Sequence, residues 1–387
     1  MRLPQPDADA LHLSERLLEL MRRQAEDGWL AFSRYMAMAL YAPGLGYYSA
    51  GSHKIGSAGD FITAPELSPL FADCLAKQCQ QALSALAGGS VLELGAGTGR
   101  LAFDLLTALE KQESLPDEYL ILEPSAELRQ RQQQCLEALP PDLSQRVRWL
   151  DALPSDGQFR GVVIANEVMD AMPVELFVWQ AGEVFQRGVR THEPLRWEDR
   201  PAPPALAGAV QKLFESTGSQ WPDGYASEVN LALPAWVAAL SASLEAGLMI
   251  LVDYGYPRQE YYRAERSMGT LIAHYRHRVL DDPLLWPGLM DITANVDFTA
   301  LAEAADAAGL DVLGYTTQSW FLQALGLEEA FHARNTGKPR DQLNLVAQVR
   351  QLTLPAEMGE RFQVMLLGKQ LAIEPLGTRL KDLRHRL

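Results

Sequence analysis

The apolar positions of the chain follow two spacings that alternate along the sequence. Short apolar runs that end at a polar residue occur at 91–94, 119–122, 147–150, 162–165 and 248–252. Apolar residues recur at the spacing of an amphipathic helix over 101–110 and 126–136. Strands that alternate with helices predict an α/β fold with a mostly parallel sheet. Such a sheet binds its ligands beyond the carboxyl ends of the strands.

The residues before this alternation favour helices and loops. Residues 10–40 show helical spacing and are expected to form two helices, followed by a glycine- and tyrosine-rich loop at 41–49. Thr63 is a candidate cap for a helix that starts near Pro65. That helix, with Glu66 in its first turn, is expected to extend to Leu86.

Two later stretches interrupt the alternation. The proline-containing stretch 179–225 is expected to form short strands and loops inserted into the core. The polar and aromatic stretch 256–297 is too long for a simple connection and is expected to form a lid or a substrate wall. The apolar run 362–367 is expected to be the last strand.

Composition narrows the class of protein. The chain has 387 residues, 48% of them hydrophobic, and a formal net charge of −15, which disfavours a nucleic acid as partner. Cys74, Cys79 and Cys135 are too few and too scattered for a disulfide framework or a zinc site, and no metal is expected. No apolar run is long enough to predict a membrane span. Because the N-terminal residues resemble neither a signal peptide nor a transit peptide, a cytoplasmic location is expected.

The glycine-rich loop after the first core strand predicts a nucleotide-like ligand. Gly95, Gly97 and Gly99 alternate with other residues, and the missing Cβ atoms let a ligand lie against the backbone. The loop also fits a looser dinucleotide fingerprint. Glu93 beside it would disfavour a pyrophosphate and would suit S-adenosylmethionine (SAM), which carries a sulfonium and an ammonium group. A tight turn without a ligand is the alternative.

Acids at the ends of the next two strands are candidate cofactor contacts. Glu123 is placed to accept hydrogen bonds from both ribose hydroxyls, a role that SAM and dinucleotide sites share. Asp151 is a candidate partner for the adenine amino group. The alternative is a surface acid after a strand, and it competes more strongly for Asp151 than for Glu123.

The segment 166–174 carries the candidate catalytic residues Asn166, Glu167 and Asp170. If the turn is helical, Glu167 and Asp170 point the same way. Their carboxylates would orient a cationic acceptor such as a guanidinium and help to remove its proton, while in-line positioning would supply much of the rate. Alternatively, this pair caps nearby backbone.

Further polar residues are candidates for substrate binding. Asp253 and Tyr254 follow the fifth strand, and Glu228 precedes the helix that leads into it. A structural role for these three residues remains the alternative.

Several blocks resemble the MidA-type family of SAM-dependent methyltransferases. The matching segments are 45–48, 59–66, 93–99, 166–174, 253–255, 291–298 and 358–362. The resemblance implies a class I, Rossmann-like methyltransferase core with a mostly parallel seven-stranded sheet, an N-terminal helical segment and an inserted lid region. It places SAM between the glycine loop, Glu123 and the block that contains Thr63, Pro65 and Glu66, with Asn166 as a further cofactor contact.

The resemblance also implies a division of the chain. The expected parts are an N-terminal segment at 1–88, a SAM-binding half of the core at 89–178, an insertion at 179–235, and a second half of the core at 236–387 that includes the lid-like segment 256–297.

The mitochondrial members of this family are complex I assembly factors regarded as protein arginine methyltransferases. The sequence therefore predicts a protein arginine N-methyltransferase that converts SAM to S-adenosylhomocysteine and acts on a protein partner, with a homodimer as one possible assembly. The alternatives are a non-catalytic assembly factor that keeps the fold, a small-molecule methyltransferase and, least favoured, a nicotinamide-dependent oxidoreductase.

Overall fold

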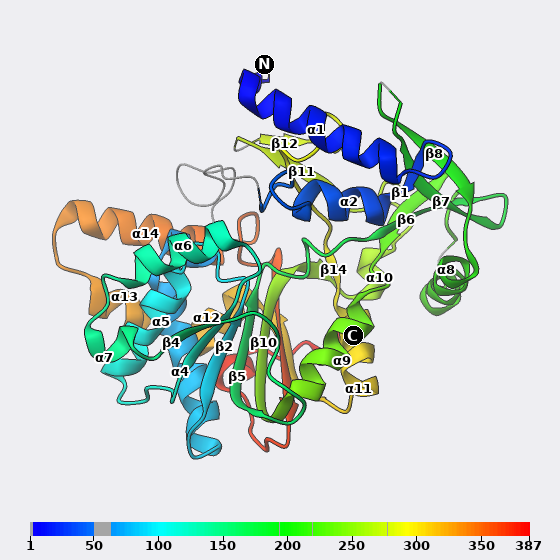
Figure 1. The fold of residues 1–387 in the computed structure, drawn as a ribbon. Helices are drawn as coiled ribbons and strands as arrows, with labels where there is room; N and C mark the ends of the chain where they lie inside the picture. The colour runs from blue at the N-terminus through cyan, green and yellow to red at the C-terminus, as the bar shows by residue number, and fades with distance from the viewer. Residues whose placement is uncertain (1–2, 50–62, 193, 219, 277) are drawn as a thin grey trace.

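The computed structural model describes residues 3–49, 63–192, 194–218, 220–276 and 278–387. It places a central sheet with covering helices below a second layer that contains two smaller sheets (Figure 1).

Within these residues the central sheet has eight strands, in the order β15-β16-β10-β5-β2-β3-β4, with β14 paired to β10. Their bounds are β2 Ser90–Leu94, β3 Tyr119–Leu122, β4 Val147–Leu150, β5 Phe159–Asn166, β10 Leu244–Tyr256, β14 Val296–Asp297, β15 Asp311–Thr317 and β16 Phe362–Lys369. The strands that the apolar runs predict all form.

The prediction of a mostly parallel seven-stranded sheet needs correction. β4, β3, β2, β5 and β10 pair in parallel, but β16 runs antiparallel to both β10 and β15, so the sheet is mixed. β14 adds an eighth strand at the end of β10. A strand buried on both faces is apolar throughout in either direction, so its apolar run does not reveal its orientation.

Helices cover both faces of this sheet. Alternate residues of β5 point to opposite faces: Val162 and Ile164 pack in one apolar cluster, and Val163 and Ala165 pack in another. The core helices and their short neighbours are α3 Ala64–Leu67, α4 Pro69–Ala85, α5 Arg100–Lys111, α6 Ala126–Leu136, α7 Pro141–Ser144, α9 Leu233–Ser243, α11 Phe298–Ala307, α12 Gln318–Ala324, α13 Leu327–Arg334 and α14 Pro339–Thr353. Residues of α4 and α5 belong to the first cluster, and residues of α9 and α11 belong to the second.

The second layer joins segments that are far apart in the sequence. A five-stranded antiparallel sheet has the order β1-β7-β6-β9 with β8 beside β7, and a three-stranded sheet has the order β12-β11-β13. The bounds are β1 Trp29–Ala31, β6 Glu175–Gln180, β7 Glu183–Arg190, β8 Arg196–Pro201, β9 Tyr225–Val229, β11 Ile272–Tyr275, β12 Arg278–Leu280 and β13 Asp291–Thr293. The helices are α1 Ala8–Gln24, α2 Phe32–Tyr41, α8 Pro204–Thr217 and α10 Arg258–Tyr261. This layer faces the carboxyl ends of the core strands (Figure 1).

Two predicted elements differ in detail. The helix expected from Glu66 to Leu86 is divided at Ser68, whose hydroxyl accepts a hydrogen bond from the Leu70 amide and caps α4. Thr63 stands at the N-cap of α3, but its side chain makes no capping bond. Residues 59–62 of the same block lie outside the described residues. Among the helices that are described, none combines the length and apolarity that a membrane span requires.

Candidate functional site

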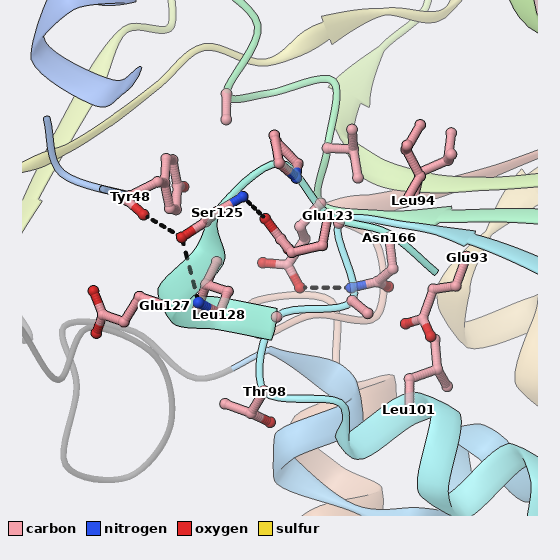
Figure 2. A pocket seen from close by; sticks show the side chains of 18 of the residues that line it. Tyr48, Glu93, Leu94, Thr98, Leu101, Glu123, Ser125, Glu127, Leu128 and Asn166 are labelled. Carbon is pink, nitrogen blue, oxygen red and sulfur yellow. Dashed lines mark hydrogen bonds between the residues drawn. The ribbon is translucent and has the colours of Figure 1, made fainter. Parts of the chain in front are cut away.

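A cavity of about 830 Å³ lies at the carboxyl ends of β2, β3 and β5, within the usual size range of small-molecule sites. Its walls come from the glycine loop, the start of α6, the segment after β5, α3 and the 41–49 segment. Figure 2 shows side chains from these elements around one hollow. The fold therefore brings the sequence blocks together where an α/β sheet binds ligands.

The glycine loop bends as its pattern predicts. Gly95, Gly97 and Gly99 have φ angles of 62°, 54° and 86°, in the left-handed region that favours glycine. A Cβ at Gly99 would lie 3.1 Å from the Cα of Gln132, so this glycine allows α5 and α6 to approach. Gly95 and Gly97 line the cavity, whereas Gly99 shapes the turn behind it.

Glu123 is buried at the end of β3 and lines the cavity. One carboxylate oxygen accepts a hydrogen bond from the Ser125 amide at 2.9 Å, and the other accepts one from Gln132 Nε2 at 3.2 Å. Gln132 Nε2 also donates to the Gly97 carbonyl at 3.1 Å. Burial raises the pKa of Glu123, while the two donors and Arg129 lower it. Sequence reasoning missed Gln132, which links the glycine loop to this acid.

Glu93 of β2 lines the cavity, on the side of Leu101 in Figure 2. It accepts a hydrogen bond from the Tyr119 hydroxyl at 2.7 Å. Burial raises the pKa of Glu93 to about 7, because the hydrogen bond from Tyr119 offsets only part of the cost of desolvating the charge. Its negative charge at neutral pH is therefore partial until a cation lies nearby.

The block around α3 forms another wall. Thr63, Pro65 and Glu66 all line the cavity, and Glu66 accepts a hydrogen bond from the Thr98 hydroxyl of the glycine loop. This contact joins α3 to the loop that the sequence predicts as the cofactor site.

Asn166 and Glu167 reach the cavity at the end of β5. Asn166 Nδ2 donates to Glu167 Oε1 at 3.1 Å, while Asn166 Oδ1 is buried and has no hydrogen-bond partner in the described part of the chain. Glu167 has a φ of 54°, an unfavourable angle for a residue with a Cβ. Burial raises the pKa of Glu167 well above its usual value, and the nearby Asp170 raises it further.

Asp253 takes a different position from the one that the sequence predicts. It is fully buried and does not line the cavity. Its Oδ2 accepts hydrogen bonds from the amides of Val168, Met169 and Asp170 at 2.9 to 3.2 Å, and its Oδ1 accepts one from the Tyr254 amide. Because both carboxylate oxygens accept hydrogen bonds from backbone amides, Asp253 holds the Glu167–Asp170 turn in position and does not face a ligand.

Asp170 is buried beneath the turn rather than in the cavity wall. Its pKa is raised well above the usual value by burial, then by Asp253 and Asp291. The turn thus carries several carboxyl groups in a small, desolvated volume. In the chain as described, no set of three or more His, Cys, Asp or Glu side chains is arranged to hold a metal ion.

Two residues that were not singled out as site residues complete this region. The Tyr48 hydroxyl donates to Asp291 Oδ1 at 2.8 Å, and the Tyr48 carbonyl accepts a hydrogen bond from the Ser125 hydroxyl at 2.9 Å (Figure 2). Tyr41 stacks on Tyr48 with ring centroids 5.6 Å apart. Tyr48 belongs to the block 45–48 that resembles the MidA-type family, and Tyr41 lies shortly before that block, so the resemblance could have identified them.

The remaining predicted residues lie outside the cavity wall. Asp151 is exposed and pairs with Arg129 at 2.8 Å. Tyr254 packs on Phe362 with ring centroids 3.9 Å apart. Glu228 is buried in β9 and accepts hydrogen bonds from Tyr261 and Thr270. The structure therefore does not bring Asp151, Tyr254 or Glu228 into contact with the cavity.

The residues that do line the cavity fit SAM. Glu123 supplies a buried carboxylate for a ribose diol, and the glycine loop leaves backbone groups exposed to the ligand. The unpartnered oxygen of Asn166 offers an acceptor for an ammonium group. Glu93 adds an acid that the positive charge of this ligand would help to ionise.

Comparison with known proteins agrees with this fit. A family model described as putative S-adenosyl-L-methionine-dependent methyltransferase matches residues 74–316. A methyl transferase candidate from Burkholderia thailandensis, bound to S-adenosyl-homocysteine, is 43% identical, with full coverage of both chains and a TM-score of 0.94.

Curated relatives also match over most of their length. The mitochondrial protein arginine methyltransferase NDUFAF7 of Danio rerio is 28% identical over 87% of this chain and 82% of its own length. Its homologue in Drosophila melanogaster is 26% identical over 90% of this chain and 84% of its own length.

Proposed function

Because the chain belongs to the family of putative S-adenosyl-L-methionine-dependent methyltransferases, we propose that it transfers a methyl group from SAM to an arginine side chain of a protein. The relatives named as protein arginine methyltransferases support the choice of acceptor. The solved relative with bound S-adenosyl-homocysteine supports the choice of cofactor.

The observation that carries the proposal is the buried acidic turn at the end of β5. Glu167 lines the cofactor cavity, and Asp170 and Asp291 lie close enough to raise its pKa. Carboxyl groups this deeply buried are costly to ionise unless a cation accompanies them. A guanidinium group is a permanent cation whose donors match carboxylate oxygens, so it suits this turn better than a neutral acceptor.

Different residues of the cavity would bind different parts of SAM. SAM supplies a methyl group on a positively charged sulfur. Glu123 would hold the ribose, and Asn166 Oδ1 would accept a hydrogen bond from the amino group. Glu66, fixed by its bond to Thr98, would help close the cavity on the α3 side.

Glu167 would orient the acceptor and receive its proton. A carboxylate that binds one part of a guanidinium localises positive charge there and leaves another nitrogen free to attack the methyl carbon. The arrival of the cation would lower the raised pKa of Glu167, so the acid would be ionised when the acceptor is in place. After transfer, the proton lost by the methylated nitrogen would go to Glu167.

Calorimetry tests the cofactor part of this proposal. SAM and S-adenosyl-homocysteine should both bind to the purified chain, and NAD should not bind, because Glu93 lies where a pyrophosphate would approach the loop. A lysate whose own methyltransferases have been inactivated by heat, incubated with labelled SAM, should gain protein-bound methyl groups only when the chain is added. Binding of NAD without binding of SAM would overturn the proposal.

A further inference from the structure

A second pocket lies beside the acidic turn. It has a volume of about 240 Å³, and we call it the arginine pocket, defined by Tyr254, Tyr256, Arg266, Thr270, Asn295 and Arg361. It shares no lining residue with the cofactor cavity. Nothing in the proposed function uses it.

Two guanidinium groups are held in this pocket by aromatic rings. Tyr254 and Tyr256 are two residues apart in β10, so their side chains leave the same face of the strand. The Arg361 Cζ lies 5.9 Å from the centroid of the Tyr254 ring, and the Arg266 Cζ lies 4.1 Å from that of Tyr256. The closer contact holds the Arg266 guanidinium over its ring, whereas Arg361 lies at the edge of cation–π range, and both contacts leave the donors at the guanidinium edge available.

The charges of the two arginines are incompletely matched. Among the described residues, neither guanidinium forms an ion pair with a carboxylate. Arg266 donates hydrogen bonds from one nitrogen to the carbonyls of Glu260 and Tyr261. Burial raises the pKa of Glu228, and the charge of Arg266 offsets a small part of that rise. The Arg361 side chain is exposed, and no described residue accepts a hydrogen bond from its guanidinium, so it is the freer of the two cations.

The pocket adjoins the residues proposed to hold the acceptor. The Tyr254 amide donates to Asp253 Oδ1, and Oδ2 of the same carboxylate holds the Glu167–Asp170 turn. The Ala294 amide donates to the Asp170 carbonyl at 2.9 Å, and Asn295, the next residue, lines the pocket. A protein chain with its arginine at the turn would therefore place neighbouring residues near this pocket.

We propose that the arginine pocket binds a carboxylate side chain of the acceptor protein, so that the enzyme prefers arginines with acidic neighbours. The inference rests on the proposed function, since it assumes that a protein arginine occupies the turn. The donor edge of a guanidinium matches the planar, bidentate shape of a carboxylate, and this pocket presents two such groups. A nucleic acid backbone suits the pocket less well, because the chain carries a net charge of −15.

The arginine pocket would let the enzyme distinguish acceptor arginines by the charge of their neighbouring residues. The acidic turn accepts any arginine that reaches it, because a guanidinium is the cation that its buried carboxyl groups need in order to ionise. A pocket of opposite sign beside the turn rejects acceptors with lysine or arginine next to the target, because like charges would then face each other.

Peptide methylation and binding test the proposal together. The peptides carry one central arginine flanked by aspartates, by asparagines or by lysines. Methyl transfer is measured with labelled SAM, and peptide binding is measured by fluorescence anisotropy on the chain loaded with S-adenosyl-homocysteine. The wild type should prefer the aspartate peptide to the lysine peptide by about tenfold, as expected for a change of charge at the rim of a site.

The matched variants are Arg361→Glu and Arg340→Glu. Both make the same charge change, but Arg340 is an exposed residue of α14, which lies away from β10 and β14 (Figure 1). Arg361→Glu should abolish or reverse the preference and leave the affinity for SAM unchanged, while Arg340→Glu should keep the preference. Arg361→Gln, which removes the charge without reversing it, should give an intermediate preference. Thermal melts check that each variant is folded.

The outcomes separate the two proposals. Methylation of all peptides at equal rates would overturn the arginine pocket and leave the proposed function in place, as would a preference that survives Arg361→Glu. A binding preference without any transfer would support the pocket and contradict the proposed function. If SAM binds but no arginine peptide is bound or methylated, both proposals fail.

Discussion

Glu167 is unfavourable in two ways, in its backbone angle and in the burial of its carboxyl group, and a residue with a purely structural role would avoid both. Its φ of 54° is unfavourable, and its carboxyl group is buried among other acids. Each left-handed residue with a side chain costs on the order of 1–3 kcal/mol. Features of this kind gather at functional sites, where the surrounding structure holds them in place. The conformation therefore supports Glu167, rather than Asp170 below it, as the residue that meets the acceptor.

Glu93 gives a prediction for the dependence of stability on pH. Its pKa is raised from 4.5 to about 7, so the folded state favours the protonated acid. The stability that this provides is fully present below the unfolded pKa and is lost as the pH rises through about 7. Without ligand, the free energy of unfolding should fall between pH 5 and pH 8.5, with Glu93 contributing on the order of 3 kcal/mol.

The variant Glu93→Gln isolates this contribution, since glutamine can still accept the hydrogen bond from Tyr119. Urea unfolding at several pH values should show a smaller loss of stability for the variant than for the wild type. The control is Glu183→Gln, a substitution at an exposed residue of β7. Equal pH dependence in the wild type and Glu93→Gln would contradict the raised pKa of Glu93.

Sequence patterns located some site residues and misplaced others. Glu123 and Asp253 both end a core strand, and both were expected to touch a ligand. Glu123 keeps contact with the cavity, whereas the amides of the turn after β5 enclose Asp253. That difference depends on the path of a neighbouring loop, which no local pattern reports. The contact of Gln132 with Glu123 was not predicted, because a glutamine within a polar helix has the sequence pattern of a surface residue.

At the scale of elements, the turn after β5 depends on Asp253 in the adjacent strand β10. One carboxylate accepts hydrogen bonds from successive amides of the turn and from the Tyr254 amide. Asp253→Asn should destabilise the protein by about 2–4 kcal/mol, because the new amide group cannot accept hydrogen bonds where the carboxylate does. Denaturant unfolding measures this loss.

The same substitution should also slow methyl transfer more than it weakens SAM binding, because the turn holds Glu167 and not Glu123, the residue proposed to hold the ribose. Asp151→Asn is the matched control, since Asp151 also follows a strand but is exposed. A stable Asp253→Asn variant with wild-type activity would show that the turn holds its shape without this carboxylate.

The periodicity of apolar residues predicted the core strands and helices. It did not predict the orientation of the strands in the sheet or the structure of the insertion. The strands β3 and β4 and the helix α6 have the predicted bounds. The insertion holds α8, Pro204–Thr217, where only short strands and loops were expected, since its prolines suggested irregular structure. Pro203 and Pro204 instead stand at the start of this helix, where proline is well tolerated.

At the scale of the whole molecule, the cavity depends on both layers. Tyr48 links the N-terminal segment to Ser125 at the start of α6 and to Asp291 of β13. The core alone contributes the glycine loop and Glu123, and the second layer adds Tyr41 and Tyr48. Because these contacts join residues far apart in the sequence, the apolar pattern identified the segments and not their assembly.

The central claim is transfer of a methyl group from SAM to an arginine nitrogen with the help of Glu167. The direct measurement uses SAM with a deuterated methyl group, a heat-inactivated cell lysate as acceptor, and fragmentation mass spectrometry to locate the label that the added chain transfers. The wild type should place label on arginine side chains. Glu167→Gln should lower the transfer by at least about 100-fold and still bind SAM in calorimetry. Label on another residue type would contradict an arginine acceptor, and undiminished transfer by Glu167→Gln would contradict the catalytic role of Glu167.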